Sequence, residues 1–171
     1  MPLYAIDDRV PQIHPDAYIH PDAVIIGDVR IGPRASVWPS AVLRGDRGTI
    51  AIGARTSIQD GAVIHCTAEL DTVIGEGCVV GHCVHIEGAT VEDGALIGSG
   101  SVVLQRAHVG TGAIVGAAAL VPPGVHVPAR ATALGVPAKI RPDSADPDVI
   151  AHAVATYVDN AEWYSRLRRI D

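Results

Sequence analysis

An aliphatic residue recurs at every sixth position along most of this sequence, and this spacing limits the possible folds more than any other feature. The series begins at Ile13, continues through Ile19 and Ile25, and reaches Val127 after short insertions. A small residue, most often alanine, stands two positions before most members of the series. A helical fold would show a period near 3.6 residues, which is not present.

The six-residue period predicts a coil of very short strands. Positions i and i−2 of a strand point to the same side, so each aliphatic residue and the small residue before it would face inward. One six-residue unit cannot bury its apolar side alone, so successive coils must stack about 4.8 Å apart. We therefore predict an all-β solenoid over residues 1–142, with an N-terminal cap, a coil that ends near Val127 and a closing segment.

The remaining residues, 143–171, predict a single C-terminal α-helix. The stretch "LGVPAKIRP" at residues 134–142 is an exit from the coil, interrupted by prolines. Asp146 is the expected N-cap of the helix, and Pro147 is expected at its first position. Apolar residues along one stripe, beginning at Ile150, would pack the helix against the solenoid or a neighbouring subunit.

Composition excludes several classes of partner. The formal net charge is −6 and the basic residues are scattered, so we expect no binding of nucleic acid. No segment approaches the roughly 20 apolar residues of a membrane span, and the N-terminus does not resemble a leader, so a cytoplasmic protein is expected. Cys66, Cys78 and Cys83 follow no disulfide spacing and are predicted to be free thiols, with Cys78 facing the core.

Residues three units apart should occupy equivalent positions in adjacent coils. His65 and Glu87 each follow an aliphatic position of the series, so they are predicted to stack, with Arg44 one coil earlier. Asp60 and His82 are predicted to form a second stack near the preceding corner. Outward polar residues are usually only solvated, but these gather at one place, which makes them candidates for a site.

Four stretches make the chain similar to the gamma-class carbonic anhydrases among the hexapeptide-repeat proteins. They are "WPSAVLRGDRGTIAIG" at residues 38–53, "TSIQDGAVIH" at 56–65, "VIGEGCVVGH" at 73–82 and "LGVPAKIR" at 134–141. The resemblance implies a left-handed parallel β-helix that assembles as a homotrimer. It also implies metal sites between subunits, holding zinc or, alternatively, iron, each with two histidines from one chain and one from its neighbour.

The same resemblance assigns roles to individual residues. His65 and His82 match two metal ligands, Arg44 and Asp46 an interface ion pair, and Gln59 and Asp60 the residues beside the metal-bound water. The implied activity is that of a lyase of the carbonate dehydratase type, which converts carbon dioxide to bicarbonate with a metal-bound hydroxide oriented by Gln59. The proton shuttle is not identified. Tyr157 or Tyr164 could reach a site from the C-terminal helix, although packing is the expected role of both.

The chain departs from the family at the third metal ligand. The family has a histidine five residues after the position of His82, where this chain has Glu87. Stacking with His65 would allow Glu87 to bind, His85 is the alternative third ligand, and a third possibility is that no metal is held stably. A carboxylate ligand makes the metal a poorer Lewis acid, so we expect slower hydration than in a relative with three histidines.

Two other functions remain open. Many hexapeptide-repeat proteins are acyltransferases that use acyl-coenzyme A, although the insertions at residues 44–51 and 68–72 are short for a catalytic loop. The chain is alternatively a non-catalytic trimer that acts as a binding or assembly module, which the replacement of a ligand histidine by Glu87 would favour. Binding of acetyl-coenzyme A, and the effect of altering Arg44 or Asp46, distinguish these functions.

Overall fold

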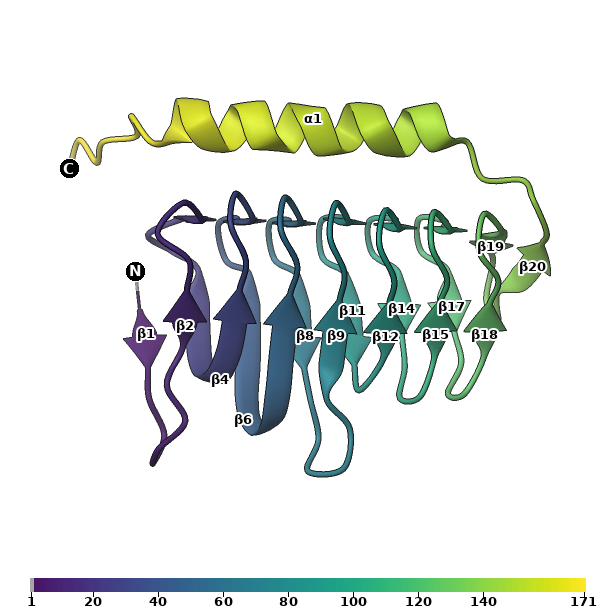
Figure 1. The fold of residues 1–171 in the computed structure, drawn as a ribbon, viewed down its shortest axis with the longest axis horizontal. Helices are drawn as coiled ribbons and strands as arrows, with labels where there is room; N and C mark the ends of the chain where they lie inside the picture. The colour runs from purple at the N-terminus through teal and green to yellow at the C-terminus, as the bar shows by residue number, and fades with distance from the viewer. Residues whose placement is uncertain (1) are drawn as a thin grey trace.

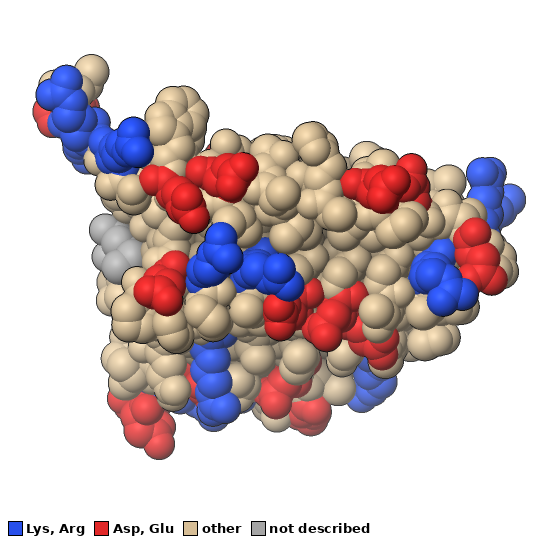
Figure 2. All heavy atoms as spheres, turned by 45° about the horizontal axis from the view of Figure 1, so that its top comes forward, with Lys and Arg blue, Asp and Glu red and all other residues tan. Residues whose placement is uncertain are grey.

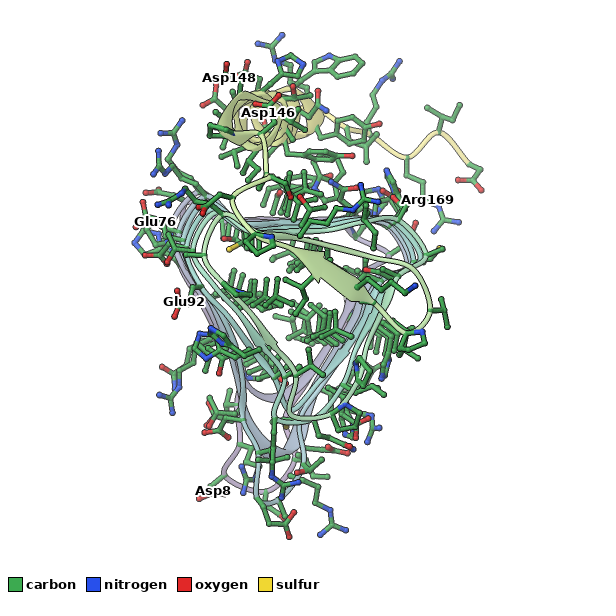
Figure 3. All side chains as sticks on the ribbon, turned by 90° about the vertical axis from the view of Figure 1, so that its right-hand side faces the viewer. Asp8, Glu76, Glu92, Asp146, Asp148 and Arg169 are labelled. Atoms are coloured by element: carbon green, nitrogen blue, oxygen red, sulfur yellow. The ribbon has the colours of Figure 1, made fainter. Side chains whose placement is uncertain are left out.

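The computed structural model describes residues 2–171, which form a parallel β-solenoid followed by one α-helix (Figure 1). The solenoid matches a left-handed β-helix of hexapeptide repeats, so the predicted fold class is confirmed. Viewed along its axis, the coil has a triangular cross-section with three flat sides (Figure 3). Each coil contributes one short strand to each side.

Two of the sides are joined by the long strands β4 and β6. The first side contains β2 (Gln12–Ile13), the later part of β4 (Val24–Ile31), the later part of β6 (Val42–Ile52), β9 (Thr72–Ile74), β12 (Thr90–Val91), β15 (His108–Val109) and β18 (His126–Val127). The second side contains β1 (Leu3–Tyr4), the earlier parts of β4 and β6, β8 (Val63–His65), β11 (His85–Glu87), β14 (Val102–Val103) and β17 (Leu120–Val121).

The third side is a separate sheet. It contains β3 (Tyr18–Ile19), β5 (Ser36–Val37), β7 (Ser57–Ile58), β10 (Val79–Val80), β13 (Leu96–Ile97), β16 (Ile114–Val115), β19 (Thr132–Leu134) and β20 (Lys139–Arg141). All pairs on this side are parallel except β19 with β20, which is antiparallel.

The interior consists of the residues that the six-residue period places inward. Leu43 and Ile64 are fully buried, as are the alanines two positions before them, Ala41 and Ala62. Complete burial of one such aliphatic side chain contributes about 1.5–3 kcal/mol to stability. Cys78 occupies one of the small inward positions and is also fully buried, as predicted.

Strands β4 and β6 each bend from the second side to the first, and two paired glycines lie at this bend. Gly27 has a φ of +80°, and a Cβ atom built on it would collide with the backbone carbonyl of Gly45 in the next coil. The pairing of β4 with β6 shifts between Gly27 and Val29, because two positions along β4 correspond to five along β6, from Gly45 to Ile50. Glycine is needed here because no side chain fits between the two backbones.

The coil continues one strand beyond its predicted end at Val127. Strand β19 pairs in parallel with β16, and Ala133 is buried at the inward position. The six-residue series of larger aliphatic residues stops at Val127 because alanine occupies this last inward position. Strand β20 then folds back against β19, so the proline-containing exit includes a small hairpin.

Helix α1 (Pro147–Tyr164) returns along the third side of the solenoid toward the N-terminal end (Figure 1). Asp146 is its N-cap, and the carboxylate of Asp146 accepts a hydrogen bond from the backbone amide of Asp148 at 3.0 Å. The predicted start of the helix is therefore confirmed. Ile150 is its one buried residue.

Aromatic rings join α1 to the solenoid. Trp38 is buried, and its ring centroid lies 5.4 Å from that of Tyr157 and 5.1 Å from that of Tyr164. The indole N–H of Trp38 donates to the hydroxyl oxygens of Ser36 and Ser57, each at 3.0 Å. These contacts fix the helix against β5 and β7.

Charged side chains of both signs are interspersed on the face that carries α1 (Figure 2). Within residues 2–171, no helix has the length and apolar character needed to cross a membrane.

Candidate functional site

The predicted polar column on the second side is confirmed by the strand register. Arg44 of β6 pairs with His65 of β8, and His65 pairs with Glu87 of β11. The hydroxyl of Thr72 donates to the backbone carbonyl of His65 and accepts a hydrogen bond from the amide of Gly88 at 2.9 Å. Thr72 therefore holds the ends of the two strands that present His65 and Glu87.

The carboxylate of Glu87 lies between two imidazoles. Oε1 of Glu87 is 3.6 Å from Nδ1 of His65, and Oε2 is 3.6 Å from Nε2 of His85. The side chains of His65 and Glu87 are mostly covered, at 18% and 22% exposed, whereas that of His85 is 37% exposed. We call His65, His85, Glu87 and Asp46 the Glu87 cluster.

Asp46 joins this cluster from the other side of His65. Its Oδ1 atom lies 3.5 Å from Nε2 of His65, and both atoms are buried without a hydrogen-bond partner among residues 2–171. Its Oδ2 atom accepts a hydrogen bond from Nη1 of Arg44 at 2.6 Å. Burial raises the pKa of Asp46, but the hydrogen bond and charge of Arg44 outweigh burial and hold the pKa below its ordinary value. The structure forms the Arg44–Asp46 pair within one chain.

The second predicted stack forms a separate cluster. Nδ1 of His82 lies 3.0 Å from Oδ2 of Asp60, and Nε2 of His82 lies 3.3 Å from the hydroxyl of Tyr157 on α1. A carboxylate accepts hydrogen bonds, so the ring tautomer with its proton on Nδ1 would suit Asp60 and would leave Nε2 to accept from Tyr157. About half of each side chain of His82 and Asp60 is exposed. We call His82, Asp60 and Tyr157 the His82 cluster.

Packing was the main role expected for Tyr157, with contact to a site as the alternative, and the structure places its hydroxyl beside Nε2 of His82. Burial, followed by the charge of Asp60, raises the pKa of Tyr157 above its ordinary value. Gln59, which precedes Asp60, is buried at 4% exposed, and its backbone amide donates to the carbonyl of Val80 at 2.9 Å.

The predicted metal ligands are not gathered within one chain. In residues 2–171, no group of three or more His, Cys, Asp or Glu side chains is placed to hold one metal ion. No ion pair or hydrogen bond in this part of the chain joins the His82 cluster to the Glu87 cluster. A shared set of His65, Glu87 and His82 therefore requires a second subunit.

The cysteines are free, as predicted, and differ in environment. Sγ of Cys66 accepts a hydrogen bond from the backbone amide of Gly48 at 3.2 Å, and burial raises the pKa of the Cys66 thiol. Burial raises the pKa of Cys78 to about 11. Cys83 is exposed in the turn next to His82. Cys66 and Cys78 are accordingly structural thiols.

Comparison with known proteins places this geometry in a family. The family model described as "Bacterial transferase hexapeptide (six repeats)" matches residues 11–45. The carnitine operon protein CaiE of Escherichia coli is 36% identical over 139 residues, which cover 81% of this chain and 71% of that protein. The chain belongs to the hexapeptide-repeat transferase family. Hexapeptide-repeat β-helix proteins of this kind typically form trimers.

Two crystal structures resemble the hexapeptide-repeat chain over nearly its whole length. A hexapeptide transferase family protein from Anaplasma phagocytophilum is 33% identical, with a TM-score of 0.91, and covers 95% of this chain and 98% of its own. A Bacillus cereus protein assigned provisionally as an acetyltransferase is 32% identical, with a TM-score of 0.94, and covers 97% and 98%. These names support the hexapeptide-repeat part of the expected resemblance. They point to transferases, and none of them mentions a carbonic anhydrase.

Proposed function

We propose that this protein is a hexapeptide-repeat acyltransferase that uses acyl-coenzyme A, with His82 as its general base. The observation that carries the proposal is the pairing of Nδ1 of His82 with the carboxylate of Asp60 at 3.0 Å. This pairing leaves Nε2 as the basic nitrogen on a half-exposed ring. A histidine oriented in this way by a carboxylate is suited to removing a proton from an attacking group. The transferase names of the relatives support the same class of reaction.

In this mechanism Nε2 of His82 takes the proton of a hydroxyl or amine acceptor as that group attacks the thioester carbonyl. The carbon–sulfur bond then breaks, and the coenzyme A thiolate leaves and receives the proton. Asp60 keeps the imidazole in its useful tautomer and stabilises the positive charge that the ring acquires. The hydroxyl of Tyr157 lies where an acceptor hydroxyl would have to approach, so Tyr157 must move or share that position.

We further propose that the protein is a homotrimer whose second side is buried between subunits. Val42, Val63, His85, Val102 and Leu120 are neighbours in successive coils and form an outward column on this side. Four of the five are aliphatic, and Val63 is 39% exposed in the single chain. An apolar column on a flat surface favours association with other copies. Size-exclusion chromatography with light scattering should give about three times the chain mass of 17.7 kDa.

The acyltransferase proposal is tested first by the binding of acetyl-coenzyme A. Saturating acetyl-coenzyme A should raise the thermal unfolding temperature, because a ligand that binds only the folded state stabilises it. Slow release of coenzyme A, followed with a thiol reagent, should fall by about a hundredfold or more in His82→Ala, since general bases contribute that much. His14→Ala is the matched control, because His14 is also exposed beside a carboxylate, Asp16. Absence of thermal protection by acetyl-coenzyme A would reject this function.

A metal-dependent, carbonic anhydrase-like function is the second candidate, and the Glu87 cluster favours it. Nε2 of His65 and Oδ1 of Asp46 are buried without hydrogen-bond partners, which is unusual for polar atoms unless another group completes the site. Imidazole nitrogen and carboxylate oxygen are donors that suit zinc and iron(II). His65 and Glu87 of one chain with His82 of a neighbour would hold the ion, with His85 as the alternative to Glu87.

In that case the ion would supply activation of water for the hydration of carbon dioxide to bicarbonate. The chain would contribute Arg44, which holds Asp46 ionised beside His65, and Gln59 and Asp60 next to the ligand His82. The two candidates make incompatible demands on His82, because a ring nitrogen that binds metal cannot accept a proton.

Elemental analysis of untagged protein, purified without chelator, separates the two functions. About one zinc or iron per chain, lost in Glu87→Ala but kept in His85→Ala, would identify Glu87 as the third ligand; the opposite result would identify His85. Protein that takes up no metal after loading would eliminate the carbonic anhydrase-like function. If acetyl-coenzyme A also fails to bind, a trimer that Arg44→Ala dissociates would be left as a binding or assembly module.

A further inference from the structure

We infer that the imidazoles of His108 and His126, oriented by the carboxylate of Glu92, form a binding site for a divalent transition-metal ion on the first side of the solenoid. The site is distinct from both clusters described above, and it does not depend on the proposed function. Strands β15 and β18 are neighbours, and His108 and His126 are paired in register. Their side chains therefore leave the same side of the coil one above the other.

The two rings are close enough to share one ion. Their centroids are 4.9 Å apart and their planes are inclined at 66°. A metal bound at about 2.1 Å to one nitrogen of each ring needs those nitrogens roughly 3–4 Å apart, which this separation allows without movement of the strands. β18 is the last strand on this side, so no further strand lies next to it to cover His126. Its side chain is exposed to solvent.

Glu92 fixes the orientation of His108. Oε1 of Glu92 lies 2.6 Å from Nε2 of His108, while Oε2 accepts hydrogen bonds from the amide and the hydroxyl of Thr111 at 2.8 and 2.7 Å. Both oxygens of the Glu92 carboxylate are therefore held by hydrogen bonds, one to His108 and one to Thr111. Glu92 points outward from one flat side of the coil (Figure 3).

This arrangement leaves a free electron pair on His108. Because an ionised carboxylate accepts only, Nε2 of neutral His108 must donate to Glu92, and Nδ1 is left unprotonated. In metal sites, the ring nitrogen of a ligand histidine that does not bind the metal commonly donates a hydrogen bond to a carboxylate. Among residues 2–171 no third side chain is placed to complete the set, so water would fill the remaining positions. Imidazole pairs suit copper, nickel and zinc, and copper(II) should bind most tightly.

Copper(II) titration of the untagged protein tests this inference. We expect a binding event whose electron paramagnetic resonance spectrum shows coupling to two nitrogens. His126→Asn and His108→Asn should each abolish the two-nitrogen signal, and both should fold because the side chains are at the surface. Glu92→Gln should keep both ligands but weaken binding by about tenfold, the lower end of the usual effect of such partners.

Two controls separate this site from other histidines. His14→Asn removes an exposed histidine whose equivalent in the next coil is Gly32, and it should leave the titration unchanged. His65→Ala alters the Glu87 cluster and should also leave the two-nitrogen signal in place. A signal that persists in His126→Asn, or one that disappears in His65→Ala, would overturn the inference, as would the absence of any copper binding.

Discussion

The hydroxyl of Tyr157 lies 3.3 Å from Nε2 of His82, although 75 residues separate the two in the sequence. Since Asp60 holds Nδ1 of the same ring, neutral His82 should be the Nδ1–H tautomer, which long-range 1H–15N correlation spectra can identify. Asp60→Ala removes the acceptor and should shift the ring toward the Nε2–H tautomer. In Tyr157→Phe the tautomer should stay unchanged. An Nε2–H tautomer in the unaltered protein would contradict the assignment of His82 as a general base.

Replacing Trp38 with alanine should detach much of α1 from the solenoid. Trp38 is 4% exposed and touches the rings of Tyr157 and Tyr164, so Trp38→Ala should cost about 3–5 kcal/mol, as is usual for large aromatic residues in a core. Trp163 belongs to the same helix but is 66% exposed, and Trp163→Ala should cost less than about 0.5 kcal/mol. Chemical denaturation of the two variants gives the comparison. Equal losses would show that the aromatic contacts do not hold the helix.

Gly27→Ala should be far more damaging than Gly94→Ala, although both glycines have positive φ values. A Cβ at Gly94 meets nothing within 4 Å, so only the backbone conformation is penalised, by about 1–2 kcal/mol. A Cβ at Gly27 would strike the carbonyl of Gly45 and should raise the cost to about 3 kcal/mol or more. Thermal unfolding of both variants measures the difference. A Gly27→Ala protein as stable as Gly94→Ala would mean that β4 and β6 separate easily.

Only one of the three cysteines should react in the folded protein. Cys83 is exposed, whereas Cys66 and Cys78 are fully buried. With its pKa raised to about 11 by burial, Cys78 would be thiolate in about one molecule in a thousand at pH 8, so it should resist iodoacetamide as long as it stays buried. Mass spectrometry after native labelling should show modification at Cys83 alone, and all three sites after denaturation. Early labelling of Cys78 would indicate that its coil opens readily.

Most of the fold could be predicted because a six-residue period fixes which side chains point inward. The same period predicted that Arg44, His65 and Glu87 would lie in one column, and the register confirms it. The period did not predict the last strand of the coil, because Ala133 stands where a larger aliphatic residue was expected.

The contacts of the site were less predictable than its columns. Stacking placed Asp60 beside His82, but no local pattern shows that α1 returns along the third side and brings Tyr157 to the same ring. His108 and His126 occupy corresponding positions in adjacent coils. Their spacing of three units was visible in the sequence, but the contact of His108 with Glu92 follows from side-chain orientation, which the period does not determine.

The antiparallel strand β20 has a consequence for how the solenoid ends. A parallel ladder that simply stopped at β19 would present unpaired backbone groups to the first coil of another molecule, and repetition of that contact would produce a fibre. β20 occupies those groups on the third side and runs in the opposite direction, so a parallel strand from another molecule cannot extend the ladder there. The ladder of the third side is thereby closed within each chain, and a version with one extra coil of three six-residue units inserted before β19 should be a longer prism with the same closing strand.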